Sequence, residues 1–406
     1  MSEERAHDIG ARLRSARRQR GMSLRTLAGL SGLSAGFLSM VENGQRHLDR
    51  TGHITALADA LRIAPTELTG QVLAPTDPAT ASAHEAVPAL RLALMGVGHP
   101  PTSGSRGPLA ARVAQANRLY HRCEYGVLAH KLPPLLADLR AAVDDASPDR
   151  RPRLLRLLAD AYHPACTMLL KYLGYPDLAY VAVIRADEAT AELDDPLRDA
   201  LSGFFHAHVL ISAGSPDLAL NHAELAADMV ERHLVGPEAH ALLGELHLIR
   251  ATCLTQDVRR SGADRASEVK QHLAAAGELA ARTGETKAWH LNFGPTNVGI
   301  HRVSLNTDLG RHGHAVAASR GLRPRILGAP GRDAAFHADL GRSLAHLRGH
   351  DADAVTELLT AERTAPQRIH ANAMVRDTVS ALLDRQLPSR TAREVRALAH
   401  RMGVQG

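Results

Sequence analysis

The sequence predicts an all-α protein in two parts, a small N-terminal domain of short helices followed by a long domain of helical repeats. The composition is 45% hydrophobic and 22% charged but only 3% aromatic, which is typical of helix-rich proteins. Amphipathic helical patterns follow one another along the chain with short turns between them. At 406 residues the chain is too long for one ordinary hydrophobic core, so two or more domains are expected.

The N-terminal part contains two short helices joined by a tight turn. A basic amphipathic helix over residues 7–20 ends at Gly21. Ser23 opens a second helix, and Ser34 caps a third after a turn that contains Gly32. Two short helices joined in this way describe a helix-turn-helix unit. The segments "ITALADAL" and "APTELTG" add a further helix and a last helical turn, which gives a five-helix domain.

The run "SLRTLAGLSGLSAGFLSMVENGQR" resembles the helix-turn-helix domain of phage Cro and lambda repressor and of the XRE family of bacterial regulators. The resemblance covers about 60 residues and implies that residues 1–70 bind an operator in double-stranded DNA. The matching features are Leu27-Ala28, Gly32 in the turn, Ser34 as a cap, Leu38-Ser39, Glu42 and Gly44-x-Arg46.

The same resemblance implies which residues meet DNA. The recognition helix is expected to enter the major groove with its N-terminal residues at the base edges. Few of them can make a bidentate contact, so specificity is expected to depend also on thymine methyl groups and DNA shape. Phe37 is equally suited to the core of the small domain. The expected base-reading residues are Thr26, Ser34, Ala35, Gly36, Phe37, Ser39, Met40 and Asn43, and the expected phosphate contacts are Arg17, Arg18, Arg25 and Arg46.

Residues 71–107 predict a linker, because their ends are rich in Pro, Ser, Thr and Gly and only their middle could form a short helix. Beyond the linker the helical patterns repeat. The near-copies "GYPDLAY" at Gly174 and "GSPDLAL" at Gly214 lie 40 residues apart. If both glycines lie at inter-helix turns, Ala179 and Ala219 are the small residues where paired helices approach closely. Equivalent positions are Ala266, Ala315 and Ala354.

The order of small and large residues around Ala354 resembles the second helix of a tetratricopeptide repeat. Residues 108–406 therefore resemble a tetratricopeptide-type α-solenoid, and the alternative is a helical bundle of no particular type. The whole layout is similar to the peptide-sensing regulators of the PlcR, NprR and Rgg group. That similarity of architecture implies a homodimer and an output gated by a peptide or small-molecule effector, without identifying the effector.

The segment "KAWHLNFGPTNVGIHRVSLNTDLG" is the strongest candidate for a ligand site in the repeats. After a break at Gly294-Pro295 it resumes as a helix with one polar and one apolar face, as expected for a helix that lines a groove. Asparagine side chains can pair with peptide N–H and C=O groups, and aromatic rings can cover an apolar group. In the alternative interpretation the polar face meets water and Trp289 fills a packing gap. The expected ligand-binding residues are Trp289, Asn292, Phe293, Asn297, His301, Ser304 and Asn306.

Other classes of function are not indicated. The sequence has no phosphate-binding loop, no nucleophile elbow and no His-Glu-x-x-His pattern, so we expect no enzyme, no metal and no cofactor. Cys123, Cys166 and Cys253 are widely separated and predict neither a disulfide framework nor a zinc site. No apolar run reaches the roughly 18 residues that span a bilayer, so we expect a cytoplasmic location without membrane contact.

The leading hypothesis is a transcriptional regulator that binds DNA as a dimer and senses a diffusible signal. The alternative is a DNA-binding adaptor whose repeats dock a protein partner.

Overall fold

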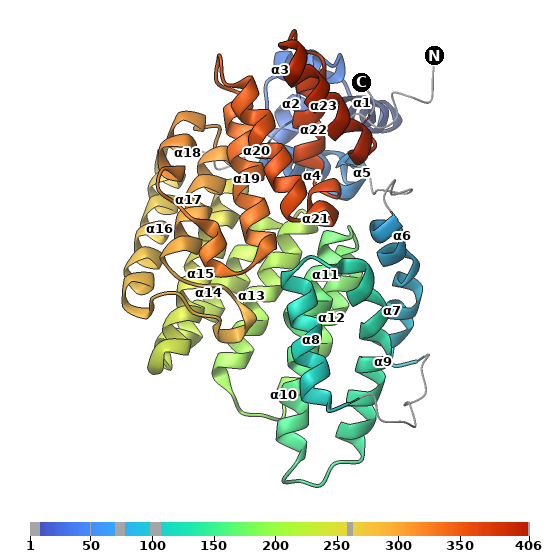
Figure 1. The fold of residues 1–406 in the computed structure, drawn as a ribbon, viewed down its shortest axis with the longest axis vertical. Helices are drawn as coiled ribbons and strands as arrows, with labels where there is room; N and C mark the ends of the chain where they lie inside the picture. The colour runs from blue at the N-terminus through green and yellow to red at the C-terminus, as the bar shows by residue number, and fades with distance from the viewer. Residues whose placement is uncertain (1–8, 49, 70–77, 98–106, 258–262, 405–406) are drawn as a thin grey trace.

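The computed structural model describes residues 9–48, 50–69, 78–97, 107–257 and 263–404 (Figure 1). Within these ranges the protein is built of helices and contains no strand. The one extended pairing is an isolated antiparallel bridge between Thr286 and Phe293. The predicted all-α fold, with a helix-turn-helix domain followed by a helical solenoid, is confirmed.

The N-terminal domain consists of five helices around its own hydrophobic core. Leu13, Leu27, Leu38, Leu57 and Leu61 are fully buried in this core and come from four of the helices. The helices are α1 (Ile9–Gln19), α2 (Leu24–Ser31), α3 (Ala35–Glu42), α4 (Thr51–Leu61) and α5 (Pro65–Thr69).

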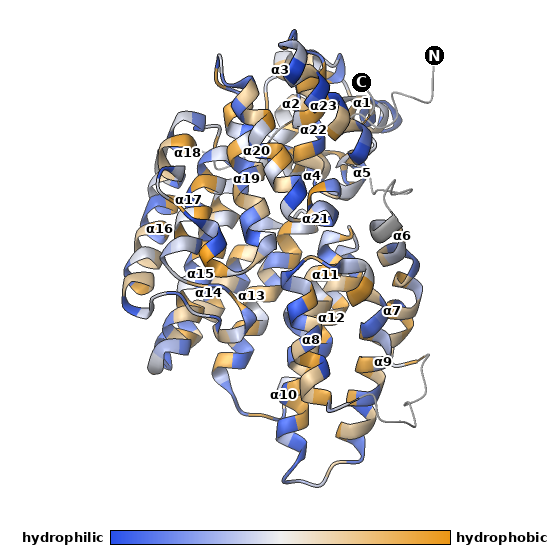
Figure 2. Cartoon of the chain, viewed as in Figure 1, coloured by the Kyte–Doolittle hydropathy of each residue, from blue (hydrophilic) through white to orange (hydrophobic). Residues whose placement is uncertain are grey.

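The C-terminal domain stacks helices side by side around a second, larger core. Most helices bury one face, and hydrophobic and hydrophilic residues alternate along them in Figure 2. The helices are α6 (Pro78–Glu85), α7 (Val87–Leu94), α8 (Leu109–His121), α9 (Tyr125–Asp144), α10 (Arg151–Ala161), α11 (Thr167–Tyr172), α12 (Pro176–Thr190), α13 (Pro196–Ser212), α14 (Pro216–Arg232), α15 (Gly236–Gln256), α16 (Ala263–Thr283), α17 (Pro295–Asp308), α18 (His312–Ser319), α19 (Pro330–Ala345), α20 (Asp351–Thr364), α21 (Pro366–His370), α22 (Ala373–Leu383) and α23 (Ser389–Met402). A π-helical turn (Tyr162–Cys166) and two 3₁₀ turns (Ala288–His290 and Pro324–Leu327) join some of them.

Glycine turns and small residues produce the repeated helix pairs. Gly174 and Gly214 have φ values of 85° and 87°, which glycine adopts without steric cost, and each ends the turn before a proline-initiated helix. Ala179 and Ala219, five residues further along, are fully buried as expected. The equivalent Ala315 and Ala354 are also fully buried, whereas Ala266 is only half-buried. The most extensive pairings join α13 to α14, α15 to α16 and α19 to α20.

The segment expected to be a linker contributes to the second domain. It contains two helices, α6 and α7, where the sequence analysis expected one. Both pack against α9, and the fully buried Ala83 and Leu90 belong to the same core as the repeats. Residues 70–77 and 98–106 on either side lie outside the described residues.

The break before α17 is a loop fixed by tight packing. Gly294 has a φ of 155°, and a Cβ there would meet the backbone of Glu285 at 2.8 Å. The ring of Phe293 occupies the space that a side chain at Gly244 of α15 would need, so the ring fits only because residue 244 is a glycine. The C-terminal end of this loop is therefore part of the hydrophobic core, where Phe293 is only 1% exposed.

Candidate nucleic-acid interface and sensor core

Local hydrogen bonds that the sequence encodes shape the helix-turn-helix unit. Ser23 caps α2 by accepting a hydrogen bond from the backbone N–H of Thr26 at 3.0 Å. Ser34 caps α3 in the same way, from the N–H of Phe37 at 3.2 Å. Between the helices Gly32 has a φ of 72°, and the axes of α2 and α3 bend by 116°. This geometry leaves the first turn of α3 at the surface.

Arg17 forms hydrogen bonds with other residues of this domain. Its Nε and Nη2 each donate to one carboxylate oxygen of Glu42 at 2.6 Å, and its Nη1 donates to the carbonyl of Met22 at 2.8 Å. The side chain of Glu42 is only 3% exposed, and its hydrogen bond with Arg17 raises the pKa of the guanidinium. These donors join α1 to the end of α3, so Arg17 has a structural role, and the phosphate contact expected of it stays a prediction.

The other predicted DNA contacts gather on one small domain and are mostly accessible. Exposed arginines are the groups that neutralise phosphates most readily. Among the described residues, Arg18, Arg25 and Arg46 have no carboxylate partner within ion-pair distance. The exposed members of the predicted set are Arg18, Arg25, Thr26, Ser34, Gly36, Met40, Asn43 and Arg46, and the half-buried members are Ala35, Phe37 and Ser39.

Phe37 packs against the core of the small domain, as the alternative interpretation expected. Its ring meets the edge of His53 at a centroid distance of 5.4 Å, and the guanidinium carbon of Arg46 lies 5.6 Å from its centroid. Asn43 caps the C-terminal end of α3, and its side-chain oxygen accepts a hydrogen bond from Arg14. These contacts fix the two ends of the recognition helix.

In the second domain, helices that are distant in sequence line a partly open cavity of about 30 Å³, room for about two water molecules. Its lining comes from α8, α11, α13, α19, α21 and the loop before α17. Met168, Phe204 and Leu291 give it apolar surface, while His208, Arg332 and Arg368 give it polar surface. Polar and apolar groups contribute about equally to its surface, and a pocket with a few converging polar groups beside apolar ones can hold a ligand.

One of the seven predicted ligand residues lines this cavity, and a second contacts a lining residue. Asn292 lines it and is hydrogen-bonded to His121 at 3.4 Å. His301 contacts a guanidinium nitrogen of the cavity residue Arg332 at 3.3 Å. Burial and the nearby positive charge of Arg332 lower the pKa of His301 to about 3, so its ring is neutral at pH 7.

The other five predicted ligand residues do not converge on the cavity. Trp289 donates to the carbonyl of Glu238 at 3.0 Å and packs against the core, as the gap-filling alternative expected. Asn297 is fully buried and donates to Glu245 at 2.9 Å. Asn306 donates to a carbonyl of its own helix at 2.7 Å, Ser304 is half-buried on α17, and Phe293 is in the core. Helical spacing identified one face of α17, but α15 and α19 cover different parts of that face.

The sequence analysis missed His208, Arg332 and Arg368. They are more than 30 residues apart in sequence, and nothing distinguishes Arg332 and Arg368 among the 48 lysines and arginines or His208 among the 24 histidines of the chain. Only the packing of α13, α19 and α21 brings them to one cavity.

The two domains touch through the turns and the C-terminal helices of the second domain. Pro65 of α5 packs on Gly214, and Arg50 occupies the space beside Gly310 that a side chain would need. His47 lies 3.1 Å from a carboxylate oxygen of Asp377 on α22, and Met374 of the same helix belongs to the core of the small domain. Figure 1 shows α22 and α23 beside the N-terminal helices.

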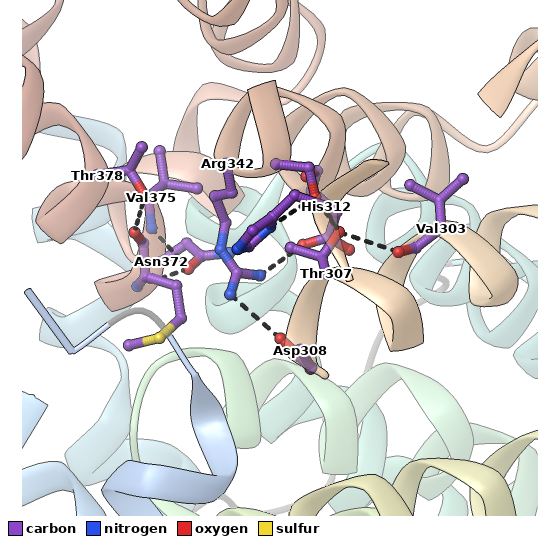
Figure 3. Close-up of polar contacts among 11 residues, drawn as sticks. Val303, Thr307, Asp308, His312, Arg342, Asn372, Val375 and Thr378 are labelled. Atoms are coloured by element: carbon purple, nitrogen blue, oxygen red, sulfur yellow. Dashed lines mark hydrogen bonds and ion pairs between the residues drawn. The ribbon is translucent and has the colours of Figure 1, made fainter. Parts of the chain in front are cut away.

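A buried polar network joins α17 and α19 (Figure 3). The hydroxyl of Thr307 lies 2.8 Å from that of Ser343, and Arg342 forms ion pairs with Asp308 at 3.1 Å and Asp339 at 2.7 Å. Arg342 is only 4% exposed, so these contacts join α17 and α19 rigidly. Asn372 caps α22 at the edge of the same view by accepting hydrogen bonds from two backbone N–H groups.

Among the described residues no group of three or more His, Cys, Asp or Glu side chains is arranged to hold a metal ion. In the same part of the chain no single helix is long and apolar enough to cross a membrane, although α2 and α3 meet the length and composition criteria together as a bent pair.

Residues 8–69 match the family model of a helix-turn-helix domain. The N-terminal part of the chain is therefore a DNA-binding domain of the helix-turn-helix class. Among solved structures, the chain is similar to Bacillus thuringiensis PlcR, crystallised in complex with the peptide PapR7 and DNA. The identity is 14%, the TM-score is 0.30, and the match covers 68% of this chain and 95% of that one. No curated protein matches the sequence.

Proposed function

We propose that the protein is a sequence-specific DNA-binding transcriptional regulator whose helical domain senses a diffusible ligand and holds two copies together. The observation that carries the proposal is the accessible first turn of α3, with the exposed Arg25 and Arg46 close to it in sequence. Arginines of this kind fix a domain on the phosphates while the recognition helix reads the major groove. The cavity in the second domain and its converging polar groups support the sensing part.

A homodimer makes a geometric prediction about the operator. Two symmetry-related recognition helices read half-sites about 34 Å apart, one turn of DNA, or a multiple of that distance. Selection of bound fragments from genomic DNA is expected to yield a pseudo-palindrome with that spacing. Bound sequences without any two-fold symmetry would contradict the dimer.

The role of the exposed arginines is tested by the salt dependence of DNA binding. Each phosphate contact contributes about 0.9 to the slope of log affinity against log salt concentration. Arg25→Ala and Arg46→Ala are each expected to lower the slope by about that amount and to weaken binding to all DNA sequences alike. Fluorescence anisotropy at several salt concentrations measures the slope, and Arg153→Ala on the exposed surface of α10 is the control. An unchanged slope in both variants removes the assigned phosphate contacts.

An experiment can distinguish a repeat domain that senses a diffusible ligand from one that docks a protein partner. A ligand-sensing domain is stabilised by the dialysable fraction of a cell extract, whereas a docking domain is stabilised only by the retained fraction. Thermal melts of the full chain with each fraction distinguish them.

A further inference from the structure

The interior of the second domain holds three positive side chains close to one another. Arg332 and Arg368 line the cavity. The guanidinium carbon of Arg368 lies 4.3 Å from the centroid of the Tyr172 ring, and the ammonium nitrogen of Lys171 lies 5.1 Å from the same centroid. Among the described residues none of these three cations has a carboxylate partner within ion-pair distance.

The neighbouring groups do not balance this charge at neutral pH. Burial and the positive charges of Lys171 and Arg332 lower the pKa of His208 well below its ordinary value, so its ring is neutral. Burial opposes ionisation of Tyr172, but Arg368 and Lys171 outweigh it and lower the pKa of that phenol to about 8. Tyr172 is therefore mostly uncharged at pH 7.

One buried carboxyl group, Glu245, interacts with Arg332 through space, yet it is directed elsewhere. It accepts a hydrogen bond from Asn297 at 2.9 Å. Burial raises its pKa more than Arg332 and Asn297 lower it. The cavity therefore has a local excess of positive charge.

Cations that are withdrawn from water lose hydration free energy, and a group of opposite charge restores it. The attraction is stronger in the interior than at the surface because the effective dielectric constant is lower. A planar guanidinium also matches the two oxygens of a carboxylate, which makes a paired hydrogen-bond geometry available to each arginine.

We propose that the cavity is a binding site for the carboxylate of an organic acid, with Arg332 and Arg368 receiving the carboxylate and the apolar lining receiving the hydrocarbon part. Met168, Phe204 and Leu291 supply that apolar lining. This inference rests on the proposed sensing function, for which it names the class of ligand. The carboxylate belongs either to a free organic acid or to the C-terminus of a short peptide, which share this chemistry.

The small volume of the cavity limits how much of a ligand it can hold. A volume of about 30 Å³ accommodates an end group and not a whole ligand. A longer acid must displace part of the lining, and the loop that carries Leu291 and Asn292 is one segment of the lining without regular helix. Binding is thereby coupled to the shape of the repeats.

The test compares acids with their uncharged amides on the full chain by isothermal titration calorimetry at pH 7. The probes are 3-phenylpropionate with 3-phenylpropanamide, and N-acetyl-Leu-Phe with its C-terminal amide. One acid of the two pairs is expected to bind at least about ten-fold more tightly than its amide, since a charge-assisted hydrogen bond contributes about that factor. The pair that shows the larger difference identifies the source of the carboxylate. Equal binding of acids and amides, or binding of neither acid, overturns the proposal.

Variants locate the site. Arg332→Gln and Arg368→Gln are each expected to reduce the preference for the acid about ten-fold, while Arg302→Gln, on the exposed face of α17, leaves it unchanged. Because Arg368 stacks on Tyr172 and its loss could disturb the fold, the acid and amide comparison on the unaltered chain stands independently. A preference that survives both substitutions overturns the assignment of the two arginines.

Tyr172 supplies a spectroscopic readout. A bound carboxylate screens the cations that lower the pKa of this phenol, so the acid probe is expected to raise that pKa and reduce tyrosinate absorbance near pH 8. The amide probe leaves the absorbance unchanged. An acid that binds with these signatures but does not alter DNA affinity supports the site and contradicts the sensing function, so the two proposals fail separately.

Discussion

The two domains use positive side chains in opposite ways. In the small domain Arg18, Arg25 and Arg46 are exposed, so water solvates their charge. Each can replace its hydration by a contact with a DNA phosphate at low free-energy cost. In the second domain the half-buried Arg332 and Arg368 face a partly open cavity, where water compensates their charge less than at the surface. The first arrangement suits a long polyanion that is bound from outside, whereas the second suits one small anionic group. The same residue type therefore indicates different partners according to its surroundings.

The largest expected effect is a loss of stability at acid pH, because buried histidines of the second domain resist protonation. Burial lowers the pKa of His163 and of His301 to about 3, and the pKa of His121 to about 4. The ordinary value is about 6.5, so the unfolded chain binds these protons first as the pH falls. Stability is therefore highest above about pH 6.5 and decreases towards pH 4, by about 1.4 kcal/mol per pH unit for each such histidine.

Urea unfolding of the full chain at pH 7, 6 and 5 measures this loss of stability. His163→Asn is expected to make the decrease shallower, since one group that resists protonation is removed. His400→Asn, at an exposed position on α23, is the matched control and leaves the pH dependence unchanged. A stability that stays constant between pH 7 and pH 5 would contradict the neutral state assigned to these histidines.

The next effect concerns Arg17, which forms hydrogen bonds inside the small domain. Arg17 and Glu42 form a paired hydrogen-bond arrangement in which the carboxylate is nearly inaccessible. Glu42→Ala leaves the guanidinium without its partner, and a broken buried ion pair typically costs about 3–5 kcal/mol. Hydrogen exchange of α1 and α3 is expected to accelerate accordingly. Arg18→Ala, one position away and exposed, is expected to change stability by less than about 0.5 kcal/mol, and equal effects of the two substitutions would refute the structural role of the pair.

The parts of the fold that the sequence predicts well are those that depend on local interactions. Ser23 and Ser34 cap the helices that follow them, and Gly32, Gly174 and Gly214 form the expected turns. Each of these features depends on residues within a few positions of one another, so no knowledge of distant contacts is required. Ala266 shows the limit, because its position fits the repeat but its burial depends on which helix lies opposite.

The candidate sites divide in the same way. The residues expected to contact DNA lie on one short unit, so the sequence alone brings them together, although their roles remain predictions. The ligand residues were assigned from one face of α17 and the loop before it. Of these residues, Asn292 lines the cavity and His301 contacts the lining residue Arg332. Arg332 and Arg368 could not be found from the sequence, because long-range packing alone determines which of many arginines is enclosed.

The smallest expected effect lies where the two domains meet. His47 of the small domain contacts Asp377 of α22 at 3.1 Å and Asp384 at 3.9 Å, and the side chain of His47 is 24% exposed. A partly solvated pair of this kind contributes about 1 kcal/mol or less. In a double-mutant cycle, His47→Gln and Asp377→Asn are expected to show a coupling energy of that size for stability.

The same cycle measured on DNA affinity decides what the junction does. If the second domain controls the position of the recognition helices, loosening the junction changes DNA affinity by more than it changes stability, and the two substitutions are not additive. Glu394→Gln on the neighbouring α23, whose carboxylate pairs with Arg390 and not with the small domain, is the control. Additive and negligible effects on DNA affinity would mean that this contact does not carry a signal between the cavity and the DNA face. Other contacts between the domains, among them the packing of Arg50 on Gly310, of Pro65 on Gly214 and of Met374 in the core of the small domain, stay in place in these variants.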